Sequence, residues 1–228
     1  AHTKESTAII IKSTVPPGTA MMLEKMIRDK GYKHPIISNP EFLREGNAIK
    51  DFMNPDRIVI GTNGGGGIDL MEKIYKHFIE KSHNILFTCQ TSSELAKYAS
   101  NAFLATKIAF INEMANLCEK TGADIDLVAK ALGLDPRIGP AFLKTGPGFG
   151  GSCFPKDILA LEYLAKIQES PCLVLSAVIT SNKKRAIDII AKIKLVLGDL
   201  NDKMIAILGL AFKAGTDDVR NSPAIEVV

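Results

Sequence analysis

The stretch ILFTCQTSSELAKYASNAFLATKIAFINEMANLCEKTG, residues 85–122, decides the fold class, because its hydrophobic pattern changes partway along. Ile85-Leu86-Phe87 is a short apolar run of the kind that forms a buried strand. Thr91 and Glu94 fit a capping box, and from there apolar residues recur at helical spacing until Gly122. This pattern predicts one helix over residues 92–120, about 45 Å long. A helix of that length is typical of a connector between lobes or of a subunit interface.

Upstream of this helix, short apolar runs alternate with helical patterns. We expect strands at residues 8–13, 35–38, 57–61 and 85–87, and helices at about 20–30 and 68–81. Pro16-Pro17-Gly18 and Gly64 to Gly67 mark turns between them. The alternation predicts an α/β fold class, with part of a parallel sheet covered by helices.

Downstream, no strand pattern interrupts residues 91–197, which predicts an all-helical domain. Its further helices are expected at about 124–132, 138–144, 156–168 and 172–197. Residues 204–210 again resemble a buried parallel strand, and Ser222-Pro223 is a helix start with proline at the first position. A third, α/β lobe is therefore expected to start near residue 203.

The composition is that of an ordinary globular chain. Of 228 residues, 46% are hydrophobic and 23% are charged, which excludes intrinsic disorder. The net charge of +3 does not indicate a nucleic-acid or membrane partner. No apolar run is long enough to span a membrane, and no secretory signal is visible.

The two ends suggest a segment of a longer chain. The sequence begins Ala1-His2-Thr3 and enters a strand-like run almost at once, and it stops at Val228 in a helix barely begun. The alternative is a trimmed domain that is self-sufficient.

The four cysteines form no CxxC pair and no zinc-like cluster, so no metal site is expected. Without a secretory signal, a reducing cytoplasm is the expected compartment. Cys89, Cys118 and Cys172 are expected to be packing residues. Cys153 is different, because it lies in the run Gly146-Pro-Gly-Phe-Gly-Gly-Ser-Cys-Phe-Pro-Lys-Asp157.

The glycines of this run match G-x-G-x-x-G, but no strand precedes them, so a dinucleotide-binding turn is not expected here. They should allow close approach of a ligand and offer free N–H groups to anionic oxygens. Cys153 lies at the start of a helix opened by Pro155, with Lys156 nearby, which favours a thiolate. Cys153 is therefore a candidate nucleophile, and the alternative is a small buried residue in a glycine-rich turn.

Other polar residues have both a functional and a structural interpretation. Lys97 and Asn101 lie four residues apart on one helix face, where they could hold an oxyanion or simply form a solvated polar face. Glu41 and Glu45 could form a site or a solvated turn. Three cations could bind phosphate or be surface charges: Arg137, Lys144 and Lys213.

Five motifs together resemble the nucleotide-sugar 6-dehydrogenases, the UDP-glucose/GDP-mannose dehydrogenase family. They are Ile11-Lys-Ser-Thr-Val-Pro-Pro-Gly-Thr19, Ser38-Asn-Pro-Glu-Phe-Leu-Arg-Glu-Gly46, Asn54-Pro-Asp-Arg57, Glu94-Leu-Ala-Lys97 with Asn101-Ala-Phe103, and Gly148-Phe-Gly-Gly-Ser-Cys-Phe-Pro-Lys-Asp157. The resemblance covers essentially the whole chain, in the right order. It implies that residues 1–90 are the C-terminal part of a Rossmann-like NAD-binding domain. Residues 91–202 would be a helical dimerisation domain, and 203–228 the beginning of a UDP-sugar-binding domain.

The family's activity is the oxidation of a sugar C6 alcohol to a carboxylate with two NAD⁺, and UDP-glucose is the substrate the resemblance favours. Cys153 would be the nucleophile, passing through a thiohemiacetal and a thioester. Lys97 and Asn101 would stabilise the oxyanion, Glu41 would be the acid/base of thioester hydrolysis, and Thr14 and Asp157 would position water or tune the thiol.

The resemblance also implies binding positions. The cofactor-contacting positions would be Ser13, Thr14, Val15, Glu45, Cys153, Lys156 and Arg220. The substrate-contacting positions would be Glu41, Phe42, Leu43, Arg44, Glu45, Lys97, Asn101, Arg137, Lys144, Phe149, Gly150, Phe212 and Lys213. Arg137 would reach the site of a neighbouring subunit, which agrees with the long helix as the spine of a homodimer.

The sequence departs from the family pattern in one respect. These 228 residues contain no strand followed by the glycine-rich turn that holds the NAD pyrophosphate. Three alternatives therefore stay open: a related dehydrogenase acting on GDP-mannose or a UDP-N-acetylhexosamine, a non-catalytic dimerisation fragment, and a cysteine acyltransferase or protease unrelated to NAD.

Overall fold

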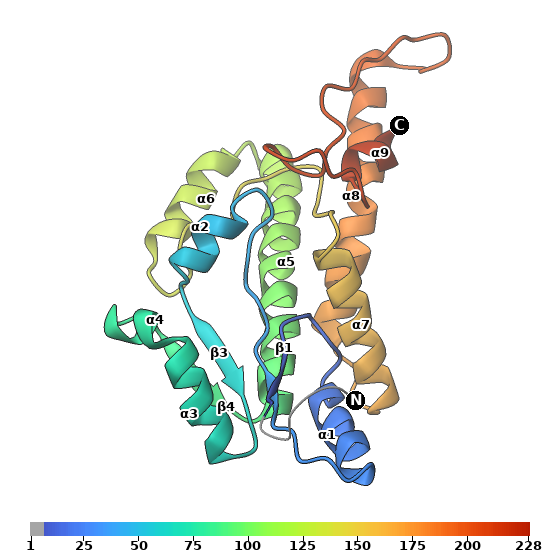
Figure 1. Ribbon diagram of the computed structural model, residues 1–228. Coiled ribbons are helices and arrows are strands. Elements are labelled where there is room, and N and C mark those ends of the chain that lie inside the picture. The colour runs from blue at the N-terminus through green and yellow to red at the C-terminus, as the bar shows by residue number, and fades with distance from the viewer. Residues whose placement is uncertain (1–6) are drawn as a thin grey trace. The chain divides into compact units, whose positions relative to one another are not determined.

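The computed structural model describes residues 7–228. The first six residues of the expected NAD-binding segment, His2 among them, lie outside the described range. The described residues form two compact units, one that ends at Ala99 and one that spans Ser100–Val228. Each unit has its own hydrophobic core. Figure 1 labels the helices and strands of both.

The first unit contains a four-stranded sheet in the order β1-β2-β3-β4. The strands are β1 (Ile9–Ile11), β2 (Ile36–Ser38), β3 (Ile58–Gly61) and β4 (Ile85–Thr88). β1 pairs with β2, and β3 with β4, in parallel as predicted, but β2 and β3 are antiparallel. The prediction of a wholly parallel sheet was wrong at this pair. The registered pair is Ser38 with Gly61, the last residue of each strand, and the segment between the strands carries one short helix.

Four helices belong to this sheet unit: α1 (Thr19–Asp29), α2 (Ala48–Met53), α3 (Gly65–Ile74) and α4 (Lys76–Glu80). The single helix predicted over 68–81 is in fact two helices, which are separated at Tyr75. The side chain of Tyr75 is buried. Short α2 was not predicted. The core of the unit consists of Ile37, Ile58, Ile60, Met71, Tyr75 and Phe78, which come from β2, β3 and the segment that holds α3 and α4.

The long helix α5 spans Gln90–Thr121, and its 32 residues confirm the prediction from the apolar spacing (green in Figure 1). It begins in the first unit and continues into the second. The second unit adds α6 (Ile125–Leu134), α7 (Phe154–Ile167), α8 (Leu173–Leu197) and α9 (Pro223–Val227). Its core is formed by Ala102, Ala105, Ala109, Phe149, Ile158, Leu175 and Val178.

Two predicted elements are absent from the described part of this unit. Residues 138–144 form turns rather than a helix, because Gly139 (φ +69°) and Phe142 (φ +64°) adopt left-handed backbone conformations. Residues 204–210 form no strand, and the side chains of Met204 and Leu208 are almost fully exposed. A strand needs a neighbouring strand for its backbone hydrogen bonds, and the only sheet described is the one in the first unit.

The four cysteines are free thiols. Cys118 is buried and Cys172 is half-buried against the core, as predicted for packing residues, whereas Cys89 is exposed and the packing role predicted for it was wrong. Across residues 7–228, no helix combines the length and the hydropathy needed to cross a membrane.

Candidate active-site residues

Glu41 and Lys97 are two predicted site residues that lie together in the first unit. Lys97 Nζ is 3.3 Å from Glu41 Oε1, and the lysine side chain is only 5% exposed. Glu41 Oε2 accepts the backbone N–H of Leu43 at 2.6 Å, and the ammonium lies 5.3 Å from the ring centre of Phe42. A lysine this deeply buried needs an anionic partner. The alternative of a solvated face is therefore wrong for Lys97.

The loop that carries Glu41 starts from a buried residue that sequence reasoning missed. Asn39 is 1% exposed, and its Oδ1 accepts hydrogen bonds from Lys12 Nζ (3.0 Å) and the Tyr75 hydroxyl (2.6 Å). Its Nδ2 donates to the Val59 carbonyl at 2.8 Å. These bonds fix the end of β2. The partners are distant in sequence, so no local pattern could have revealed this network.

Glu94 has a role different from the predicted capping box. Its two carboxylate oxygens accept the backbone N–H groups of Gly18 (2.6 Å) and Ala20 (2.8 Å), and the residue is 2% exposed. It thus caps the N-terminus of α1 from a helix more than 70 residues away, and α5 itself begins at Gln90. A helix N-terminus attracts anions. At α1 this position is filled by a carboxylate of the protein itself.

In the second unit, four predicted residues meet at the start of α7. Cys153 is the exposed N-cap residue, and its carbonyl accepts the N–H of Asp157 at 2.9 Å. Asp157 is 1% exposed and accepts Asn101 Nδ2 at 2.6 Å, while the Lys156 ammonium bonds its other oxygen. Asn101 is buried by this contact, so it does not belong to a solvated face. Cys153 is not the small buried residue of the alternative interpretation.

In the glycine-rich run before Cys153, some of the N–H groups expected to be free are already bonded to the protein itself. Three of its N–H groups are bonded within the unit: Gly146 to Asn112 Oδ1 (2.9 Å), Phe149 to Asn182 Oδ1 (2.8 Å) and Gly151 to the Arg220 carbonyl (2.9 Å). The ring of Phe149 lies in the core. A substrate contact through this ring would therefore require Phe149 to leave the core.

Two glycines of the run are required by the protein's own packing. A Cβ on Gly150 would lie 2.1 Å from the Asn221 carbonyl oxygen, and one on Gly151 would lie 2.8 Å from the Phe212 ring. Lys213 Nζ is 5.4 Å from the centre of that same ring. The glycines were expected to let a ligand approach the backbone closely. At Gly150 and Gly151 it is residues 212–223 of the protein that lie this close. The two segments are about 60 residues apart in sequence, so the local sequence pattern could not predict this contact.

Three predicted arginines are bonded to nearby aspartates. The Nη2–Oδ distances are 2.5 Å for Arg44–Asp51, 2.6 Å for Arg137–Asp135 and 2.8 Å for Arg220–Asp218. Hydrogen bonds from each guanidinium hold the pKa of its aspartate below the ordinary value. Of the other predicted positions, Ser13, Glu45 and Lys144 are exposed, while Thr14 and Val15 are half-buried just after β1.

Two family models match this chain. The NAD binding domain of the UDP-glucose/GDP-mannose dehydrogenase family matches residues 1–79, and the central domain of the same family matches residues 91–184. The chain belongs to the UDP-glucose/GDP-mannose dehydrogenase family. Ser13 to Val15, Glu41 and Glu45 fall in the first match, and Lys97, Asn101, Cys153 and Asp157 in the second. Phe212, Lys213 and Arg220 lie outside both.

The chain is similar in sequence and in structure to several members of this family. The chain is 54% identical over 228 residues to a UDP-glucose 6-dehydrogenase of Rickettsia felis and 46% identical over 230 residues to UDP-glucose 6-dehydrogenase TuaD of Bacillus subtilis. All of the chain is matched, but it spans 51% and 49% of those proteins. A solved UDP-glucose dehydrogenase from Pyrobaculum islandicum is 41% identical, with a TM-score of 0.91 over 96% of this chain and 51% of that one.

The Arg44–Asp51 pair gives this family member a defined acid sensitivity. Bonds from Arg44 lower the pKa of Asp51 to about 2, whereas an unfolded aspartate titrates near ~3.9. The pair's contribution to stability is therefore complete above pH ~4 and is lost as the pH falls through about 2. We expect the Asp51 carboxyl carbon to titrate near pH 2 by NMR. Asp69→Asn, which removes an exposed carboxyl of the same unit, should leave this titration unchanged; a midpoint near ~4 in that control or in the wild type would contradict the assignment.

Proposed function

We propose that the natural protein containing these residues is a UDP-glucose 6-dehydrogenase. It would oxidise the C6 alcohol of UDP-glucose to the carboxylate of UDP-glucuronate, using two NAD⁺. The observation that carries this proposal is the match of the entire chain to proteins of that name, at 46–55% identity. Because the chain spans about half of each relative, the substrate and the activity are assigned to the whole protein.

NAD⁺ would supply the hydride acceptor for both oxidations. Ser13, Thr14 and Val15 follow the carboxyl end of β1, the edge of an α/β sheet where ligands bind, and they offer hydroxyl and backbone groups suited to a ribose or an amide. Glu45, Lys156 and Arg220 are the other proposed contacts. The N-terminus of α1 does not fit the pyrophosphate, because Glu94 already occupies it.

Cys153 would carry the second oxidation. Its thiolate attacks the C6 aldehyde, a sulfur–carbon bond forms, and the carbonyl electron pair moves to oxygen. Loss of the C6 hydrogen as hydride restores the carbonyl as a thioester. Water then adds, the sulfur–carbon bond breaks, and the carboxylate and the free thiol are released. Asp157, bonded to Asn101 and to the Lys156 ammonium, would orient water or the thiol.

Lys97 and Asn101 would stabilise the negative oxygen that develops at C6. A buried ammonium does this well, because it is fixed in place before the reaction and is not screened by water. The Lys97–Glu41 ion pair supports a linked role for Glu41, which would take the proton of the attacking water and return it to the sulfur. Thr14 would position that water.

Most of the proposed substrate-contacting residues lie in loops. They are Glu41, Phe42, Leu43, Arg44 and Glu45 of one loop, Lys144, Phe149 and Gly150 of another, together with Arg137, Phe212 and Lys213. Arg44 and Arg137 keep exposed side chains bound to aspartates, so binding through their guanidinium groups would require those pairs to open.

The direct test is substrate preference in the natural full-length protein. We expect kcat/KM with UDP-glucose to exceed that with GDP-mannose or UDP-N-acetylglucosamine by about 10²-fold or more, since unmatched polar groups in a site are costly. The measurement is NADH formation together with identification of the uronate. Equal or faster turnover of GDP-mannose would overturn the assignment of UDP-glucose and favour the related dehydrogenase.

We also propose that α5 forms the spine of a homodimer. Three large apolar residues, Phe103, Phe110 and Leu117, recur every seven positions and are 67%, 46% and 55% exposed. Residues seven apart lie on one helix face, so they form an apolar stripe that a second copy could cover. We expect Phe110→Glu to shift the protein from dimer to monomer in light scattering. Tyr163→Glu, at an exposed aromatic residue of α7, is the control that should remain dimeric; a dimeric Phe110→Glu would exclude this interface.

We propose that the protein works in the reducing cytoplasm, which suits four free thiols and a cysteine nucleophile.

A further inference from the structure

The glycine-rich run before Cys153 is held by side chains of two helices. Asn182 of α8 bonds both sides of one residue: its Oδ1 accepts the Phe149 N–H at 2.8 Å, and its Nδ2 donates to the Phe149 carbonyl at 3.0 Å. This paired contact replaces the two bonds that a neighbouring strand would make. It leaves neither backbone group of this buried residue unpaired.

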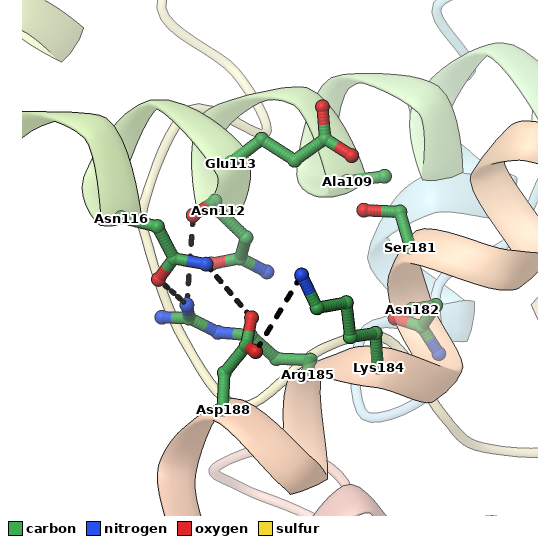
Figure 2. Close-up of a pocket in the computed structure, with 9 residues that line it drawn as sticks. All are labelled: Ala109, Asn112, Glu113, Asn116, Ser181, Asn182, Lys184, Arg185 and Asp188. Atoms are coloured by element: carbon green, nitrogen blue, oxygen red, sulfur yellow. Dashed lines mark hydrogen bonds and ion pairs between the residues drawn. The ribbon is translucent and has the colours of Figure 1, made fainter. Parts of the chain in front are cut away.

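A second residue of the run is held in the same manner. Gly146 donates its N–H to Asn112 Oδ1 of α5, and its carbonyl accepts Arg185 Nε of α8, both at 2.9 Å. Arg185 is 8% exposed and is fixed in turn by Asn116 Oδ1 at 2.7 Å. Figure 2 shows Asn112 and Asn116 from α5 and Arg185 from α8 directed toward one another. All three line a cavity of about 250 Å³. We call Asn112, Asn182 and Arg185 the loop clamp.

The sequence of the run is matched to the loop clamp. Gly148 has φ +119°, a conformation that favours glycine, and a Cβ there would lie 2.7 Å from Asn182 Oδ1. The glycine thus permits both the backbone turn and the approach of the asparagine. Five residues after Gly148 the same backbone reaches Cys153, the N-cap of α7.

We infer that Asn182 is a positioning residue for Cys153, acting through the peptide groups of Phe149. This inference rests on the proposed function of Cys153 as the nucleophile. The loop clamp fixes the backbone that leads into the reacting sulfur, and a displacement of about 1 Å at a reacting group can cost about 10²-fold in rate. Asn182 itself need not touch the substrate, so its loss should affect the chemical step more than binding.

The test compares Asn182→Ala with Thr180→Ala, whose hydroxyl bonds the Ser176 carbonyl within its own helix. In the natural full-length enzyme, Asn182→Ala should lower kcat by about 10²-fold with KM for UDP-glucose changed less than about threefold, and Thr180→Ala should change neither. Asn182→Asp keeps the acceptor for the Phe149 N–H but lacks the donor, so it should fall between the two. It also serves as the second variant if Asn182→Ala does not fold.

A readout on the 228-residue chain separates this inference from the proposed function. Hydrogen exchange over residues 146–152 should be at least about tenfold faster in Asn182→Ala than in the wild type, while α5 keeps its protection. If the wild-type enzyme shows no activity on UDP-glucose, the proposed function fails and the exchange result still decides whether Asn182 holds the loop. Wild-type kcat in a folded Asn182→Ala or Asn182→Asp variant, or unchanged exchange, would overturn the positioning role.

Discussion

Replacing Cys153 with serine is expected to reduce the formation of UDP-glucuronate by at least about 10³-fold, because an alcohol is a far weaker nucleophile than a thiolate and gives no thioester. The thiol is exposed at the N-terminus of α7, and its sulfur lies 3.6 Å from the Ser152 hydroxyl, a contact that a serine side chain can also make. The fold should therefore survive the change. The measurement is uronate formation by chromatography in the natural full-length protein, at saturating UDP-glucose and NAD⁺.

The matched control is Cys89→Ser, which alters another exposed thiol. Its Sγ donates to Ser92 Oγ at 3.1 Å near the start of α5, and the variant should keep the wild-type rate. Equal losses in both variants would indicate a general sensitivity to thiol removal. A Cys153→Ser protein that forms uronate at the wild-type rate would exclude the covalent mechanism altogether.

Gly150→Ala is expected to destabilise the second unit by about 1–3 kcal/mol, the usual cost of inserting atoms into a packed site. The added Cβ would lie 2.1 Å from the Asn221 carbonyl oxygen and 2.8 Å from Pro223 Cδ. Backbone and a proline ring cannot move aside as a flexible side chain can, so the segment leading into α9 must shift. Calorimetry should show a lower unfolding temperature, and the Gly151 N–H, bonded to the Arg220 carbonyl at 2.9 Å, should exchange faster.

Gly146→Ala provides the control within the same run. A Cβ there meets no atom within 4 Å, and its φ is not positive, so its unfolding temperature should stay close to that of the wild type. If both variants unfold at the wild-type temperature, the contact between Gly150 and residues 221–223 contributes nothing to stability.

The sequence predicted those elements whose signal is local. The apolar spacing of α5 gave its length to within a few residues, and Pro155 and Pro223 correctly marked the starts of α7 and α9. The prediction for residues 138–144 failed because composition does not show that Phe142 adopts φ +64°. The strand predicted at 204–210 failed because strand formation depends on a neighbour, which a single apolar run cannot reveal.

In the candidate site too, local motifs could be recognised from the sequence, whereas contacts with distant residues could not. Cys153, Asp157 and Lys97 could be named from their motifs, and the structure gives two of them buried, bonded environments. The contacts that Asn39, Glu94 and Asn182 make could not be predicted. These residues bond backbone or side-chain groups between 20 and 76 residues away, and a local pattern does not identify partners so distant in sequence.

The boundary between the two units falls at residues 99 and 100, inside α5, rather than in a loop. Most domain boundaries lie in exposed linkers that a protease or a gene truncation can cut without loss. Here a cut would break the backbone ladder of a helix and leave both pieces defective. The first unit would retain Glu94 only on a frayed end, and α1 would lose its anchored start. The two units are therefore expected to be inherited, expressed and exchanged between relatives as one block.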